Sequence, residues 1–231
     1  MSAGCKYSLP VYDTLLLSSP VGRRVTNRVE AAADEVNMAK ARSNGRRQEI
    51  LETLARMLEE QPGEHITTAG LAKAVGVSEA ALYRHFPSKA KMFETLIEFI
   101  EETVFTRITR IIEEESDVAA RVQQIIFLIL GFADKNPGMT RLMQGDVLVG
   151  ETARLRVRIA QFFERIETQL RQVLRESEIR NALRQPTPET ARLLLSVIDG
   201  RMALFVRGGF KNSPVEGWER QWEMLRRGIF V

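Results

Sequence analysis

Apolar residues recur at helical spacing along the chain from Arg46 to its C-terminus. Ile50, Leu51, Leu54 and Leu58 show the pattern, since steps of three and four residues fall on one face of a helix. The alternation of apolar and polar residues that is typical of a half-buried strand is absent. With 231 residues, of which 44% are hydrophobic and 27% charged, the chain can bury a sizeable core. We therefore predict an all-α fold of about nine helices.

Caps and helix breakers set the expected bounds of these helices. The side chains suited to N-caps are those of Thr67, Ser78 and Ser88. Gly76 suits the left-handed residue that ends a helix, Thr187 before Pro188 predicts a further cap, and Ser213–Glu216 predicts a capping box for the last helix. The expected helices cover about residues 46–60, 68–75, 79–85, 89–115, 117–135, 138–149, 152–179, 188–207 and 214–227.

The segment Thr68–Phe86 meets the constraints of a helix-turn-helix. Ala72 is small where the two helices would cross, Gly76 makes the turn and Val77 fills the gap below it. The shared apolar face consists of Leu71, Val75 and Leu82. The second helix of such a pair can enter the major groove of DNA, where each base pair presents a distinct pattern of donors and acceptors. The motif therefore predicts a sequence-specific DNA-binding protein.

The outward side of the second helix and the polar residues around it form the expected DNA surface. Arg84 can bind guanine or a phosphate, and Ala80 can touch a thymine methyl group. For Tyr83 there is an alternative, in which the ring packs against the first helix. The expected DNA-binding residues are Arg46, Arg47, Thr67, Thr68, Ser78, Glu79, Ala80, Tyr83, Arg84, His85 and Lys89.

The chain divides into three expected parts. Residues 1–37 contain two prolines and show no sustained helical period, which predicts a flexible extension. Met38 then heads a basic stretch that ends at Arg47, and residues 38–91 are expected to form a basic arm and the helix-turn-helix DNA-binding domain. Residues 92–231 are expected to form a helical C-terminal domain for dimerisation and partner binding.

The residues at the end of the helix-turn-helix resemble the TetR family. The segment Tyr83–Lys89 contains a tyrosine, then a phenylalanine three residues later and then a lysine, which is the family pattern at this place. The helix count and the chain length also fit. The resemblance implies a TetR-like fold in a homodimer that binds palindromic DNA sites, with one or more dimers on each site.

Within that family, the chain from residue 38 to 231 is similar to the branch of nucleoid occlusion factors. The segments that carry the likeness are Ser78–Lys89, Leu96–Glu101, Gly131–Phe132, Asn136–Gly138, Phe163–Glu167 and Gln169–Arg175. The likeness implies that the DNA-bound protein inhibits ring assembly by the tubulin-like GTPase FtsZ over the nucleoid, and so regulates cell division. The FtsZ-binding residues that it implies are Phe99, Arg107, Leu128, Gly131, Lys135 and Asn136.

Helical periodicity gives a separate reason to single out Phe99. At about 100° per residue, the fourth helix has an apolar stripe. It consists of Phe93, Ile97, Ile100, Val104, Ile108 and Ile111. Phe99 lies nearly opposite this stripe, among the polar residues Thr95, Glu102, Thr106 and Arg110. A large aromatic on a polar face is a candidate for partner contact, and packing beneath the DNA-binding domain is the alternative.

Dimer contacts are expected from the last two helices. Their apolar residues are Leu193, Leu194, Val197, Ile198, Ala203, Leu204, Val206, Trp218, Trp222 and Leu225. The pattern alone fits either a dimer interface or the core of one protomer. The resemblance favours the interface, because the C-terminal helices of TetR proteins form a four-helix dimer bundle.

Other functions have less support in the sequence. A glycine-rich phosphate loop, a nucleophile–base pair and a cluster of metal ligands are absent, so we expect no enzyme, cofactor or metal. The apolar runs are too short for a membrane helix, and we expect a cytoplasmic protein associated with the nucleoid. The main alternative is a TetR-type transcriptional repressor that responds to a small ligand, which needs an apolar pocket in the C-terminal domain.

Overall fold

The computed structural model describes the backbone of residues 29–61, 65–148 and 153–231, and the side chains within these ranges from residue 45 onward. Over these residues it contains nine α-helices, one short 3-10 helix and no extended strand, so the all-α expectation is confirmed. In the same ranges an isolated β-bridge joins Leu183 and Phe230. None of the helices in this part of the chain combines the length and the apolar character that crossing a bilayer requires.

The helices belong to two compact units. Of the described residues, those up to Leu54 and Thr67–Pro87 form the first unit, and those within Ala55–Ile66 and Ser88–Val231 form the second. The elements of the first unit are most of α1 (Val29–Glu60), α2 (Thr68–Val75) and α3 (Glu79–His85). The last six residues of α1, Ala55–Glu60, belong to the second unit.

Helix α1 begins at Val29, well before the expected start at Arg46. Residues 29–45 have no apolar stripe, so periodicity did not reveal the helix there. Five of these 17 residues are alanine and two are glutamate, which favour a helix by intrinsic propensity. The helix thus includes residues 29–37, for which no helical period was expected. Residues 1–28 of the expected extension lie outside the described residues.

The caps of α2 and α3 are those that the sequence predicts. The side chain of Thr67 accepts a hydrogen bond from the backbone N–H of Gly70 at 3.0 Å, and Ser78 accepts one from Ala81 at 3.2 Å. Gly76 has a φ of +77°, the left-handed conformation in which a side chain would be strained. These local devices fix the bounds of both helices as expected.

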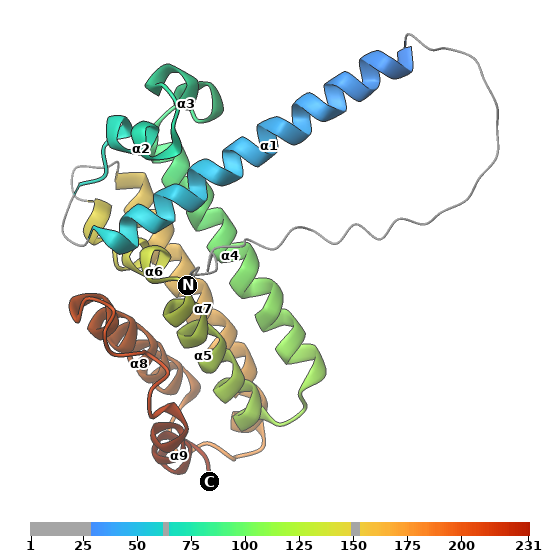
Figure 1. Cartoon of the computed structure of the whole chain (residues 1–231). Helices are drawn as coiled ribbons and strands as arrows, with labels where there is room; N and C mark the ends of the chain where they lie inside the picture. The colour runs from blue at the N-terminus through green and yellow to red at the C-terminus, as the bar shows by residue number, and fades with distance from the viewer. Residues whose placement is uncertain (1–28, 62–64, 149–152) are drawn as a thin grey trace, which may run out of the picture. The chain divides into compact units, whose positions relative to one another are not determined.

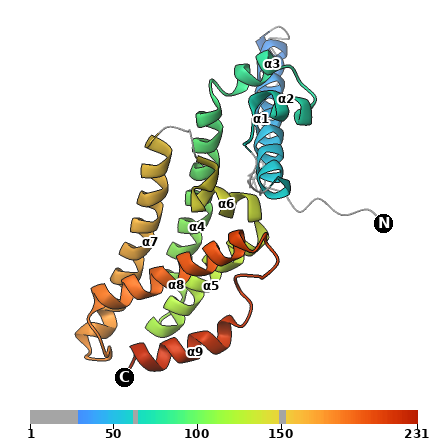
Figure 2. The same ribbon diagram turned by 90° about the vertical axis from the view of Figure 1, so that its left-hand side faces the viewer.

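The second unit is a layered bundle of helices, shown in Figure 1 and Figure 2. In both views α4, α5 and α7 run alongside one another, while α8 packs across α5, α6 and α7, and α9 packs against α5. The elements are α4 (Lys89–Glu114), α5 (Val118–Lys135), α6 (Pro137–Gln144), η1 (Asp146–Leu148), α7 (Ala153–Ile179), α8 (Thr187–Arg207) and α9 (Trp218–Ile229).

Helix α6 is shorter than expected. The apolar pattern predicted one helix over residues 138–149, but α6 ends at Gln144. Gly145 takes a left-handed conformation with a φ of +78°, which stops the helix, and the chain continues as the 3-10 helix η1. Residue 149 lies outside the described residues.

Two predicted helix starts were wrong in detail. Thr187 is the first residue of α8 instead of its cap, and its backbone N–H donates to Glu178 Oε1 at 3.0 Å. The segment Ser213–Glu216 forms a turn, in which the N–H of Glu216 donates to the carbonyl of Ser213 at 3.1 Å. The helix α9 begins only after Gly217, whose φ of +66° is incompatible with a helix that continues from this turn.

Helix α6 holds the C-terminal end of α1. Arg141, only 2% exposed, donates from Nη1 to the carbonyls of Leu58 at 3.1 Å and Gln61 at 2.7 Å. Its Nε is paired with Asp146 at 2.8 Å. These hydrogen bonds satisfy carbonyls that have no partner within α1 itself. A Cβ placed on Gly138 would lie 2.0 Å from the carbonyl oxygen of Ala55, so only glycine permits this approach of α6 to α1.

Candidate nucleic-acid interface and protein-binding surface

The helices α2 and α3 pack as the helix-turn-helix pattern predicts. The buried residues of the pair are Leu71, Ala72, Val75 and Leu82. Val77 is half-buried, in keeping with its expected place below the turn. Together with the three caps, this packing gives α3 a fixed orientation in the first unit.

The outward face of α3 carries the residues that the sequence assigns to DNA. Glu79, Ala80, Tyr83 and Arg84 are all exposed. Thr68 of α2 donates from Oγ1 to Glu79 Oε2 at 2.9 Å, and the hydroxyl of Tyr83 lies 3.5 Å from the same Oγ1. Tyr83 is 44% exposed, so its ring is not buried in the core of the unit. The face therefore presents an ordered polar network.

Arg84 is the cation of α3 that can reach a partner. Its side chain is exposed and enters no ion pair or hydrogen bond among the described residues. Lys73, in the last turn of α2, is likewise exposed and unpaired in that part of the chain, and the sequence reasoning did not single it out. Helical periodicity could have predicted that Lys73 is exposed, because it directly follows Ala72, which faces inward, and adjacent residues of a helix point in different directions.

Two of the basic residues expected to bind DNA have structural partners. Arg47 donates from Nη1 to the carbonyl of His85 at 2.7 Å, and its guanidinium lies 4.4 Å from the ring centre of Phe86. It therefore satisfies an orphan carbonyl at the C-terminus of α3. Lys89 donates from Nζ to the carbonyl of Ile66 at 2.9 Å. Neither contact was visible in the sequence spacing.

The other expected DNA contacts remain accessible. Among the residues that the structure describes, Arg46 is paired with Glu49, at 2.7 Å in an exposed position where an ion pair contributes little. The hydroxyls of Thr67 and Ser78 accept hydrogen bonds in their caps, so each can still donate to a phosphate oxygen. His85 is half-buried and presents less of its ring than Tyr83 or Arg84.

The residues expected to bind a protein partner lie on α4 and α5. These helices pack against one another in the second unit. Arg107 and Lys135 are exposed, whereas Phe99, Leu128, Gly131 and Asn136 are half-buried. Asn136 donates from Nδ2 to the carbonyl of Phe132 at 2.8 Å and so ends α5.

The two faces of α4 differ as periodicity predicts. The apolar stripe is buried from Phe93 to Ile108, and Ile111 is half-buried. On the opposite face Glu102, Thr106 and Arg110 are exposed. Phe99 stands among these polar residues with part of its ring accessible.

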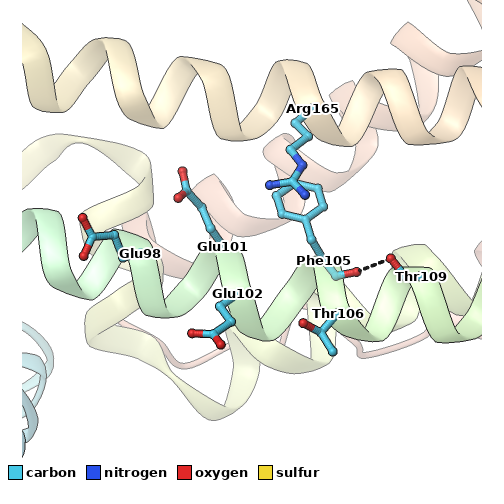
Figure 3. A pocket seen from close by; sticks show the side chains of 7 residues that line it. All are labelled: Glu98, Glu101, Glu102, Phe105, Thr106, Thr109 and Arg165. Carbon is cyan, nitrogen blue, oxygen red and sulfur yellow. Dashed lines mark hydrogen bonds between the residues drawn. The ribbon is translucent and has the colours of Figure 1, made fainter.

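A groove of about 350 Å³ lies between α4 and α7, as shown in Figure 3. Its lining consists of Glu98, Glu101, Glu102, Phe105, Thr106, Thr109 and Arg165. The guanidinium of Arg165 lies 3.7 Å from the ring centre of Phe105. This groove is open and rich in carboxylates, unlike the enclosed apolar pocket that a ligand-responsive repressor needs.

Ion pairs join α4 to α7 beside this groove. Arg158 donates to Glu98 at 3.1 Å and to Glu101 at 2.7 Å, and the hydrogen bond to Glu101 is the main reason why the pKa of Arg158 is raised. A hydrogen bond from Lys91 lowers the pKa of Glu94, with a smaller contribution from Arg154 of α7. Burial opposes both shifts, since it raises the pKa of Glu94 and lowers the pKa of Arg158.

The last two helices divide their apolar residues between core and surface. The expected interface residues that are instead buried in the protomer are Leu194, Ile198, Trp218 and Trp222. Leu193 and Leu204 are 50% and 62% exposed, and Met224 of α9 is 74% exposed. A groove of about 230 Å³ beside Leu193 and Met224 continues this apolar face.

Metal ligands do not gather in the described part of the chain: no group of three or more His, Cys, Asp or Glu residues there has the geometry to hold an ion.

Two family descriptions match the chain. Residues 50–96 match the bacterial regulatory proteins of the tetR family, and residues 116–229 match the tetracyclin repressor-like C-terminal domain. Among solved structures, the chain is similar to the ketosteroid transcriptional regulator KstR2 of Mycobacterium tuberculosis, with a TM-score of 0.67 and 19% identity over 80% of this chain and 95% of that one. The fatty acid degradation regulator FadR from Bacillus halodurans gives a TM-score of 0.68 and 15% identity over 78% and 94%. These likenesses show the TetR-like fold.

Curated relatives narrow the family. The nucleoid occlusion factor SlmA of Marinomonas sp. is 57% identical over 192 residues, which cover 82% of this chain and 98% of the relative. The SlmA proteins of Alteromonas mediterranea and Vibrio vulnificus are 55% and 53% identical, over 84% and 83% of this chain and the whole of each relative. With its helix-turn-helix unit and its bundle of C-terminal helices, this chain belongs to the SlmA family of nucleoid occlusion factors within the TetR-type regulators.

Proposed function

We propose that this protein binds palindromic chromosomal sites as a homodimer and, when bound to DNA, inhibits FtsZ assembly over the nucleoid. Family membership supports the role in nucleoid occlusion. Arg84, which is exposed on the capped helix α3 and enters no ion pair with any residue that the structure describes, carries the DNA-reading part of the proposal. Such a protein is nucleoid-associated, with residues 38–91 as the DNA-binding domain and residues 92–231 as the domain for dimerisation and FtsZ.

DNA reading follows from the face of α3. The guanidinium of Arg84 can form two hydrogen bonds to one guanine edge in the major groove, and Ala80 can contact a thymine methyl group. The hydroxyls of Thr67, Thr68 and Ser78 supply contacts to phosphates, which set register but carry no sequence information. One helix-turn-helix reads only a few base pairs, so two of them related by a two-fold axis are needed for a palindromic site.

An exposed face of α8 supports the homodimer. Leu193, Val197, Gly200 and Leu204 follow one another at steps of three and four residues and therefore share one side of the helix. A Cβ on Gly200 would meet no atom within 4 Å, so the fold of the protomer does not require a glycine there. A glycine among exposed apolar residues lets a second helix approach closely. We therefore place the two-fold contact on α8, with Met224 of α9 beside it.

The FtsZ surface is placed on the outer sides of α4 and α5. Phe99 supplies an accessible aromatic among polar residues, and Arg107 and Lys135 supply positive charge. Neither cation enters an ion pair among the described residues. The surface can therefore offer apolar contact and charge at the same time, which is typical of specific protein interfaces.

FtsZ assembly measured with and without DNA tests the proposal. The DNA is a genomic fragment that this protein itself selects from a sheared chromosomal library. We expect the protein with this DNA to reduce the sedimented FtsZ polymer strongly, and the protein with a scrambled fragment to reduce it little. Phe99→Ala should keep DNA retention but lose most of the inhibition. Equal FtsZ polymer with and without the DNA-bound protein would contradict the proposal.

A further inference from the structure

We propose that Phe127 on α5 is a further contact residue for FtsZ, where it holds an apolar side chain of the partner beside the open backbone of Gly131. The inference rests on the proposed function, because it adds a residue to the same surface. Neither periodicity nor family resemblance had singled out Phe127.

Phe127 is unusually exposed for its residue type. Its side chain is 52% exposed, while every other phenylalanine with a described side chain is buried or half-buried. An exposed aromatic ring presents a large, rigid apolar area that loses little conformational freedom on binding, which is why aromatic residues are enriched in interfaces. About half of this area is not covered by the rest of the protomer.

Helical geometry places Phe127 next to the expected partner surface. Phe127 and Gly131 are four residues apart, so they are neighbours on one face of α5, one turn from each other. Lys135 follows one turn later on the same side and is exposed. The outer side of α5 thus carries, in order, an aromatic ring, a position without a side chain and a cation.

Gly131 has no structural reason within the protomer to be glycine. It lies in the interior of α5, where glycine destabilises a helix by about 0.5–1 kcal/mol relative to alanine. A Cβ at this position would meet no atom within 4 Å. The absence of a side chain therefore leaves a notch on the outer side of α5 that permits close approach from outside, one helical turn from Phe127.

The charge beside the notch selects the occupant. Lys135 enters no ion pair among the described residues, so an apolar side chain followed by a carboxylate fits the sequence of ring, notch and cation. A second copy of this chain is the competing occupant. Its apolar face lies on α8 and α9 instead, where Leu204 and Met224 are more exposed than Phe127.

The test compares the affinity of purified FtsZ for the DNA-bound protein across matched variants. Phe127→Ala should weaken FtsZ binding roughly tenfold, as for truncation of an aromatic hot spot. Phe127→Leu keeps an apolar body and should stay within about threefold of the unmodified protein. Val157→Ala, which truncates a side chain of α7 that is 55% exposed, is the control and should not change the affinity. DNA retention and oligomeric mass should be unchanged in all three.

The outcomes separate this inference from the proposed function. If Phe99→Ala loses FtsZ binding and Phe127→Ala does not, the role of Phe127 is wrong and the proposed surface stands. If the unmodified DNA-bound protein binds no FtsZ, the proposed function fails. A lower oligomeric mass for Phe127→Ala would overturn the inference by assigning the residue to self-association.

Discussion

Arg84 and Arg47 both belong to the first unit but have different surroundings. Arg47 satisfies the carbonyl of His85 and covers the Phe86 ring, so most of its binding capacity is used within the protein. Arg84 enters no contact of this kind among the described residues. One arginine therefore supports α3, and the other can read DNA.

Replacing Arg84 tests this division of roles. Arg84→Ala should abolish specific retention of DNA in a gel shift at physiological salt, because a bidentate contact to guanine contributes about 1–3 kcal/mol of discrimination. Arg180→Ala removes one exposed positive charge from the second unit and serves as the control, which should bind as before. Unchanged specific binding of Arg84→Ala would refute the assignment of α3 as the reading helix.

A second residue-scale prediction concerns Gly138. Gly138→Ala should lower the free energy of unfolding by about 3 kcal/mol or more, since its Cβ would lie 2.0 Å from the carbonyl of Ala55 and the helices must separate. Gly45→Ala meets open space in α1 and should instead be neutral or stabilising by up to about 1 kcal/mol. Chemical denaturation of both variants measures the difference. Equal free energies of unfolding for the two variants would show that α6 can move away from α1 without loss of stability.

At the scale of single elements, the ends of helices were predictable where the device is local. Thr67, Gly76 and Ser78 cap α2 and α3 within three residues, so the sequence contains the whole device. The early start of α1 was missed because intrinsic propensity leaves no periodic pattern. Gly145 was misjudged because a glycine in a helical pattern signals a stop only when its φ is positive.

The contacts that fix the candidate site were less predictable. Arg47 and His85 are 38 residues apart in the chain, and Arg141 reaches Leu58 across 83 residues. Spacing along a helix cannot show such pairs. The exposed face of α3 followed from the motif, but which cations are free to bind DNA depended on the three-dimensional contacts.

The α4 ion pairs predict a pH effect on stability. The folded pKa of Glu94 is lowered, chiefly by the hydrogen bond from Lys91, so its stabilisation is present above the unfolded pKa and is lost as pH falls through the folded one. Lys91→Met should lower the melting temperature at pH 6, and the deficit should shrink toward pH 3. Lys211→Met removes an exposed charge with no partner among the described residues and should show no such pH dependence. A deficit constant with pH would contradict the role of this pair.

Helix α5 gives a prediction in which stability and binding change in opposite directions. Gly131→Ala should raise the melting temperature by a few degrees, because it adds about 0.5–1 kcal/mol of helix stability without a clash. The same variant should inhibit FtsZ assembly less, since the methyl group occupies the place of the partner. Calorimetry and FtsZ sedimentation measure the two effects. A variant that is more stable and inhibits as before would show that the glycine has no binding role.

At the scale of the whole molecule, the proposed DNA reading depends on two copies. Leu204→Glu places a charge on the exposed apolar face of α8, and we expect a monomer by light scattering and weak DNA binding. Ile179→Glu changes a residue that is 76% exposed at the end of α7 and should remain a dimer. A dimeric Leu204→Glu variant would move the two-fold contact away from α8.

The open glycine of α5 also has a consequence for laboratory evolution. A selection for heat resistance alone would enrich alanine at position 131, because the change strengthens the helix and meets no neighbour. On the proposed role of Gly131 in FtsZ binding, the survivors would be more stable and still retained by DNA, yet would inhibit FtsZ assembly less. A thermostability screen of this protein therefore needs a second step, which keeps only the variants that still cause filamentous growth on overexpression.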